Sequence, residues 1–301
     1  MNLNNVNQPL EDRSEPSPRS LYLVGTPIGN LSDLSPRAIS ILKNVSLVAC
    51  EDTRRSGQLL KIINSKVPLL SYHKHNSKSR LPQILEILKN QGSIALISDA
   101  GLPVISDPGE ELVRAARENN HKVVCIPGPC AAITALVISG LPTEKFCFEG
   151  FLPKKKNIRQ ERIDRISQEE RTTIIYESPH QIVNLLEQLS KSCGENRPIQ
   201  IGRELTKRYE ESIGKTIKEV IEYFQESPPR GELTIVLGGN PNHKKENTQN
   251  KLEAINKLKT LINKGQKTKD AARIVAEETG FSKNWLYSEI QKEHKTINNK
   301  D

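Results

Sequence analysis

Four short segments of small, polar and turn-forming residues follow four predicted strands. They are GTPIGN at 25–30, EDTRR at 51–55, SDAGLP at 98–103 and PGPC at 127–130. The carboxyl ends of parallel strands share one edge of a sheet, and ligands bind in the crevice at that edge. Each segment alone could be a simple turn, but the four together predict a single ligand-binding crevice.

The first segment differs from a dinucleotide-binding loop. Gly25 and Gly29 follow a strand, but the three-glycine spacing is missing and Pro27 has no N–H to hold a pyrophosphate. A ligand without phosphate fits this loop better. S-adenosylmethionine is such a ligand, because it requires an adenine slot, acceptors for its ribose and amino group, and close backbone approach around a cationic sulfur.

Carboxylates at the predicted strand ends are candidates for taking up a proton. A hydroxyl is a weak nucleophile near neutral pH, and a nearby base accelerates its reaction by roughly 10² to 10⁴. The candidate carboxylates are Glu51, Asp52, Glu177 and Glu204. Each could instead form an ion pair with an arginine such as Arg54, Arg55 or Arg203, so the sequence selects no single base.

The elements that would position these residues form an α/β pattern. Alternating strand and helix signals between residues 21 and 127 predict a parallel sheet covered by helices. The strands are expected at 21–26, 46–50, 69–73, 94–99 and 122–127. Helices are expected to begin at Ser35 and Asp107, each followed by a proline at the first helical position, and another spans 81–89.

A second α/β lobe is predicted after an apolar helix at 131–138. Its expected strands lie at 146–150, 172–177, 198–204 and 232–238, and its helices at 157–167, 179–191 and 217–225. We therefore expect a disordered tail at 1–20, an N-terminal domain at 21–127, a C-terminal domain with a mixed sheet at 128–239, a linker at 240–250 and a helical appendage at 251–295. The appendage helices are expected at 252–262, 268–279 and 282–293.

The composition is that of a basic, soluble protein. The net charge is +8, and residues from 241 onward carry 13 Lys and Arg against 8 Asp and Glu. Such a charge attracts polyanions, including RNA, although lysine-rich helix faces are common in any protein. The five cysteines have no C-x-x-C spacing, so neither a disulfide framework nor a metal site is expected. No signal or membrane-spanning segment is evident, and a cytoplasmic location is expected.

Seven longer stretches carry a specific resemblance. They are VGTPIGNLSDLSPRA, ACEDTRRSGQLL, SDAGLPVISDPGEELV, IPGPCAAITAL, IIYESPHQIV, GRELTKRYEE and GELTIVLGG, in order between about residues 21 and 239. They resemble the successive motifs of the ribosomal RNA small subunit methyltransferase I family of the tetrapyrrole methylase superfamily. EDTRR, YESPH and RELTK point to the RNA enzyme, whereas SDAGLP and GELTIV belong to the wider superfamily.

The resemblance implies two α/β domains with S-adenosylmethionine in the cleft between them, a homodimer, and 2′-O-methylation of a cytidine ribose in the decoding region of 16S rRNA. It also implies a set of donor contacts, carried over to Thr26, Pro27, Gly29, Asp99, Ala100, Gly101, Gly128, Pro129, Cys130, Ala131, Tyr176 and Leu205. Cys130 departs from the serine expected there, which leaves a hydroxyl contact at that position in doubt.

An RNA substrate requires cations around the cleft. The expected RNA-binding residues are Arg54, Arg55, Lys154, Lys155, Lys156, Arg203 and Lys207. These cations argue against one alternative, a tetrapyrrole-precursor C-methyltransferase of the same fold, which would need a wide apolar cleft. A second alternative is a non-catalytic RNA-binding assembly factor, and the intact loop motifs argue against it.

Overall fold

The computed structural model describes residues 15–240, 243–279, 281, 283 and 285–290. These residues form two compact units. The first holds the residues up to 239 apart from 168–170, and the second holds 168–170 and the residues from 240 onward. The first unit contains two separate five-stranded sheets, which confirms the predicted two-lobed α/β class.

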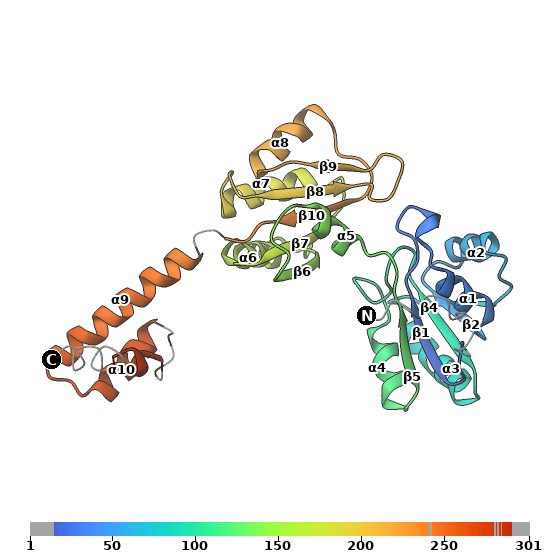
Figure 1. Ribbon diagram of the computed structural model, residues 1–301, viewed down its shortest axis with the longest axis horizontal. Helices are drawn as coiled ribbons and strands as arrows, with labels where there is room; N and C mark the ends of the chain where they lie inside the picture. The colour runs from blue at the N-terminus through green and yellow to red at the C-terminus, as the bar shows by residue number, and fades with distance from the viewer. Residues whose placement is uncertain (1–14, 241–242, 280, 282, 284, 291–301) are drawn as a thin grey trace, which may run out of the picture. The chain divides into compact units, whose positions relative to one another are not determined.

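The first sheet is entirely parallel, as predicted. Its strand order is β3-β2-β4-β1-β5. The strands are β1 (Ser20–Val24), β2 (Leu47–Cys50), β3 (Leu69–Ser71), β4 (Ser93–Ile97) and β5 (Lys122–Ile126). The helices around it are α1 (Pro36–Asn44), α2 (Thr53–Ile62), α3 (Ser77–Lys89) and α4 (Glu110–Glu118) (Figure 1).

Alternating side chains give this sheet two apolar faces. Tyr22 and Val24 pack with α1 and α2, whereas Leu21 packs with α3 and α4. This is the two-residue period of a strand buried on both sides. Ser35 begins α1 as predicted, because its hydroxyl accepts the Ala38 N–H at 3.1 Å.

One local prediction for the first unit is wrong, and two of its elements were not predicted. Helix α4 does not begin at Asp107, because Gly109 with φ of 141° is its N-cap and Asp107 stays in the preceding loop. Helix α2 was not predicted, since EDTRR was interpreted as a loop; Asp52 caps it by accepting the Arg54 N–H at 2.8 Å. The short strand β9 (Glu211–Ile213) was also missed.

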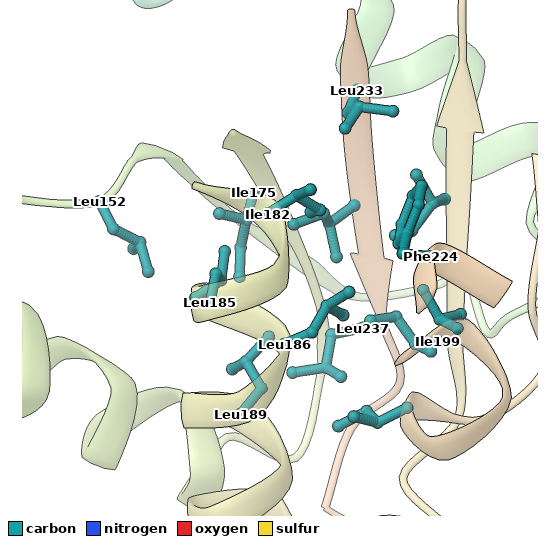
Figure 2. Close-up of a cluster of buried hydrophobic side chains, with 14 of the residues drawn as sticks. Leu152, Ile175, Ile182, Leu185, Leu186, Leu189, Ile199, Phe224, Leu233 and Leu237 are labelled. Carbon is teal, nitrogen blue, oxygen red and sulfur yellow. The ribbon is translucent and has the colours of Figure 1, made fainter. Parts of the chain in front are cut away.

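The second sheet is mixed, as predicted, with the order β6-β7-β10-β8-β9. Only β6 (Phe146–Phe151) and β7 (Thr172–Glu177) pair in parallel; β8 (Ile199–Arg203), β9 and β10 (Leu233–Leu237) pair antiparallel to their neighbours. Helices α6 (Lys156–Gln168), α7 (Ile182–Cys193) and α8 (Ile217–Glu226) contribute to the main apolar core on one face, shown in part in Figure 2. Helix α5 (Ala131–Ile138) packs on the other face.

The second unit is helical. It contains α9 (His243–Asn263) and α10 (Thr268–Thr279), which pack around buried residues such as Leu258 and Val275. Residues 243–250 are helical, so the predicted linker at 240–250 is wrong there: Lys, Glu and Gln in this segment favour a helix despite its polar composition. Of the third predicted helix, Ser282, Asn284 and residues 291–293 lie outside the described residues, and 285–290 are helical.

The predicted tail at 1–20 is partly corrected. Residues 1–14 lie outside the described part of the chain, but Glu15 forms an ion pair with Arg37 at 2.8 Å and β1 begins at Ser20. The division of the first unit into domains at residue 127 stays a prediction. None of the described helices combines the length and apolar character needed to cross a bilayer.

Candidate functional site

The loops after β1, β4 and β5 are held together through their backbones. A Cβ added at Gly25 would lie 2.7 Å from the Cα of Gly128, so glycine is required where these two loops cross. Thr26 and Gly101 exchange two backbone hydrogen bonds of 2.9 and 3.1 Å. Gly101 has φ of 86°, a conformation that glycine adopts without strain. Three of the four predicted segments therefore converge at the sheet edge.

A cavity of about 390 Å³ opens beside these loops. That volume is in the range of small-molecule sites. Its lining combines the loops of the first sheet with the ends of β7 and β10, and consists of Ile28, Ala100, Gly101, Leu102, Ile105, Ser106, Asp107, Cys130, Ala131, Phe151, Tyr176, Glu177, Ser178, Pro179, Gly231, Glu232, Leu233 and Thr234. Three of these are acidic and none is Lys or Arg.

The predicted donor contacts divide into two groups. Five of them line the cavity: Ala100, Gly101, Cys130, Ala131 and Tyr176. The others do not, namely Thr26, Pro27, Gly29, Asp99, Gly128, Pro129 and Leu205. Several of these support the wall from behind.

Leu205 illustrates this supporting position. It is buried and packs with Ile28 and helix α5 beneath the cavity wall. Gly29 lies against the backbone and side chains of residues 205–207, where a Cβ would collide with Lys207. The loop after β1 is therefore fixed against the loop after β8.

Tyr176 is held tightly at one side of the cavity. Its hydroxyl accepts the N–H of Ala132, at the start of α5, at 3.1 Å. The rings of Phe148 and Phe151 lie 5.1 and 5.5 Å from its ring, between centroids. Burial, reinforced by nearby Cys130, raises the pKa of Tyr176 to about 12. The phenol therefore stays protonated near neutral pH.

Glu177 lines the cavity but is neutralised from behind. Its carboxylate accepts a hydrogen bond from the Arg159 guanidinium at 2.8 Å, and both side chains are about nine-tenths buried. The Ser178 N–H donates to the other oxygen at 2.9 Å. Glu177 therefore forms an ion pair with an arginine, which was the alternative to a role as catalytic base. The sequence did not predict that this arginine would be Arg159 of helix α6.

Glu204 also has hydrogen-bond partners, and it does not line the cavity. Burial raises its pKa, but hydrogen bonds from Lys207 at 2.9 Å and from the Glu232 N–H at 2.8 Å outweigh burial and lower it. A Cβ at Gly231 would collide with this carboxylate. Glu204 thus fixes the Gly231–Glu232 turn, which does line the cavity.

The two carboxylates after β2 lie outside the lining as well. Asp52 bonds to the side chain of Arg54 at 2.7 Å, and this contact, together with the Arg54 N–H, lowers the pKa of Asp52 to about 2. Glu51 is exposed. Asp99 accepts the Asp52 N–H at 3.2 Å and lies 3.5 Å from Arg55.

The expected RNA-binding cations differ in how freely they present their charge. Arg54 and Arg55 have exposed side chains, and Lys154, Lys155 and Lys156 are exposed at the start of α6. Arg203 is mostly buried and paired with Glu211. Lys207 is paired with Glu204 and Glu232.

Several lining residues were not predicted from the sequence, although they lie within the stretches that carry the family resemblance. Asp107 belongs to SDAGLPVISDPGEELV, Ser178 to IIYESPHQIV, and Gly231–Thr234 to GELTIVLGG. The motifs were the available signal. Which of their residues face the cavity depends on the sheet order, which places β10 beside β7.

Comparisons with known proteins identify relatives. The family model described as Tetrapyrrole (Corrin/Porphyrin) Methylases matches residues 20–221. The chain is 46% identical to the ribosomal RNA small subunit methyltransferase I of Haemophilus influenzae, over 89% of this chain and 94% of that protein. Its counterpart from Synechocystis sp. is 44% identical, over 89% and 95%.

Solved structures share the fold at low identity. A cobalt precorrin-4 methyltransferase is 14% identical, with a TM-score of 0.57 over 73% of this chain and 95% of that one. A uroporphyrin-III C-methyltransferase from Thermus thermophilus, complexed with S-adenosylhomocysteine, is 17% identical, with a TM-score of 0.51 over 73% and 97%. These matches agree with the tetrapyrrole methylase fold.

Proposed function

This chain belongs to the ribosomal RNA small subunit methyltransferase I family, and we propose that it transfers a methyl group from S-adenosylmethionine to the 2′-oxygen of a cytidine ribose in the decoding region of 16S rRNA. The observation that carries the proposal is the 46% identity over nearly the whole of a relative with that family name. The ribose, the cytidine and the decoding region go beyond that name and rest on the motif resemblance.

The cavity suits a donor that is cationic and carries no phosphate. Its lining contains no Lys or Arg, so no cation of the lining would neutralise a pyrophosphate, and a sulfonium and an ammonium would meet no like charge there. Apolar side chains such as Ile105 and Leu233 offer a slot for adenine. Ala100, Gly101 and Ala131 allow close backbone approach.

The bound donor supplies a methyl group already activated by its positive sulfur. The protein's task is then to hold the acceptor oxygen in line with that methyl, and such positioning is worth roughly 7 to 11 kcal/mol. Tyr176 is fixed by the Ala132 N–H and by two phenylalanine rings, so it gives the cavity a rigid wall. The contacts between Gly25 and Gly128 and between Thr26 and Gly101 fix the loops that carry Gly101 and Ala131 of the lining.

The reaction is tested by supplying the protein with labelled S-adenosylmethionine and small ribosomal subunits that lack the modification. Label on the ribose of a single cytidine is expected after nuclease mapping. Label on a nucleobase would contradict the proposal, and so would transfer only to a porphyrinoid precursor offered as a competing acceptor.

We propose that the exposed cations Arg54, Arg55 and Lys154 to Lys156 contact RNA. Arg203 and Lys207 are also proposed to contact RNA, although each forms an ion pair with a glutamate. Reversing the charges of Lys154, Lys155 and Lys156 to Glu should weaken RNA binding and leave donor binding unchanged, because these lysines lie outside the cavity lining. The matched control reverses Lys43, Lys61 and Lys66, exposed lysines away from the carboxyl edge of the first sheet. Equal RNA affinity of the two triple variants in filter-binding titrations would remove the role of 154–156.

A homodimer is proposed through one apolar face of the second lobe. Strand β6 lies at the edge of its sheet, and register places Phe146 and Phe148 on the α5 side. Both are exposed, as are Ile133, Val137 and Ile138 of α5. Because α5 carries no charged residue, this face suits a second copy of the chain better than RNA.

A further inference from the structure

Asp107 lies in a loop with an unusual backbone. Between β4 and α4, Val104 and Ser106 have φ of 78° and 65°. Such left-handed conformations are strained for non-glycine residues, and they concentrate at functional sites. The Ser106 hydroxyl packs against Gly150 of β6, where a Cβ would lie 2.9 Å from it. The loop is thereby braced against the second sheet, and Asp107 lines the cavity.

The cavity's three carboxylates differ in what engages them. Glu177 is paired with Arg159. Glu232 lies 3.2 Å from Lys207 and is 73% exposed. Asp107 forms no ion pair with any residue that the structure describes, and it is only partly exposed. It is therefore the one lining carboxylate whose charge is available inside the cavity.

We propose that Asp107 is the catalytic base of the methyl transfer, an inference that rests on the proposed function. The Asp107 carboxylate accepts the proton of the ribose 2′-hydroxyl. The 2′-oxygen forms a bond to the methyl carbon while the carbon–sulfur bond breaks, and the electron pair of that bond stays on sulfur. The products are the methylated ribose, S-adenosylhomocysteine and a protonated Asp107, which then returns its proton to water.

The surroundings of Asp107 suit this role. Burial, with the negative charges of Glu51 and Asp99, raises its pKa to about 6, while a Ser98 hydrogen bond and the charge of Lys74 act against that rise. A base works best when its pKa lies close to the working pH. Above pH 6 the carboxylate is ionised, yet basic enough to take a proton. The other titratable groups on the same cavity are Cys130, Tyr176, Glu177 and Glu232.

The test measures single-turnover methyl transfer at saturating donor and RNA. Asp107→Asn and Asp107→Ser should each slow the transfer roughly 10² to 10⁴-fold, while calorimetric donor affinity and filter-binding RNA affinity stay within about threefold of wild type. The wild-type rate should also fall below about pH 6 with a slope that both variants lose. Glu110→Gln, on an exposed neighbour outside the cavity lining, is the matched control and should retain the wild-type rate.

Two results would overturn the inference without touching the proposed function. One is a wild-type enzyme that methylates the ribose while both Asp107 variants keep their rates within about threefold. The other is a loss confined to donor affinity, restored at saturating donor, which would make Asp107 a binding residue. Failure of the wild-type protein to label any ribose would instead refute the proposed function itself.

Discussion

The ion pair between Arg159 and Glu177 allows a decisive test of whether Glu177 is structural. Arg159→Met removes the guanidinium and leaves a carboxylate that is 9% exposed beside the cavity. Breaking a buried pair from one side costs about 3 to 5 kcal/mol. We expect the lower end, about 3 kcal/mol, because the Ser178 N–H still donates to Glu177. For a unit of this size that lowers Tm by roughly 6 to 12 °C.

The chain offers a matched control on the same helix. Arg162 pairs with Glu149 at 3.1 Å, but its side chain is 43% exposed. Arg162→Met should therefore cost less than about 1 kcal/mol. Both variants can be compared by urea unfolding, in which the midpoint shift multiplied by the slope gives the change in unfolding free energy.

A double variant separates the pair from its partners. Changing both Arg159 and Glu177 to Met removes the buried charge together with its counterion, so most of the stability lost in Arg159→Met should return. Equal midpoints for Arg159→Met and Arg162→Met would refute this reasoning. Glu177 would then carry a charge that Arg159 does not neutralise, and it would compete with Asp107 as the base.

Three further perturbations address the loops, Asp107 and the apolar face. Gly25→Ala should weaken donor binding at least tenfold in calorimetry, because its Cβ would meet Gly128 at 2.7 Å, whereas Gly57→Ala, with its nearest atom at 3.6 Å, should bind normally. Asp107→Asn should raise the free energy of unfolding at pH 8. The pKa of Asp107 is about 6 in the native state and 3.8 in the unfolded state, so ionisation of this carboxyl destabilises the native state. The difference in pKa corresponds to about 3 kcal/mol, and because Asp107 is partly exposed we expect a gain of about 1 to 2 kcal/mol. That gain should fade as the pH drops from 6 to 4, which thermal unfolding across pH can check. Val137→Glu should convert the proposed dimer to a monomer in sedimentation velocity, since Val137 is 70% exposed on the apolar face.

Local sequence signals predicted the elements whose causes are local. Strand β7 and helix α5 have the bounds expected from their apolar runs, and Ser35 caps α1 through its own hydroxyl. Asp107 followed by proline resembled a helix start equally well, yet the helix begins after Gly109. A local pattern cannot distinguish a cap from a strained loop when contacts with another sheet decide the conformation.

The cavity depended on information that no local pattern contains. Residues 231–234 line it because β10 inserts between β7 and β8, and the periodicity of β10 does not report that order. Arg159 was likewise absent from the interpretations of Glu177, because the pair joins a helix to a strand 18 residues away. The motif resemblance located the right stretches, and only the three-dimensional structure separated lining residues from those behind them.

The cavity is held together by contacts that are separate from the exposed cations. Its loops are joined by backbone contacts, Gly25 against Gly128 and Thr26 with Gly101, which depend little on neighbouring side chains. The exposed cations, such as Arg54 and Lys154, project from positions outside the lining. Exposed side chains can change without disturbing those backbone contacts, which is consistent with a fold shared at 14–18% identity with methyltransferases whose names specify porphyrinoid substrates. We therefore expect changes of the exposed cations to alter acceptor specificity, and changes at the contact between Gly25 and Gly128 to alter donor affinity.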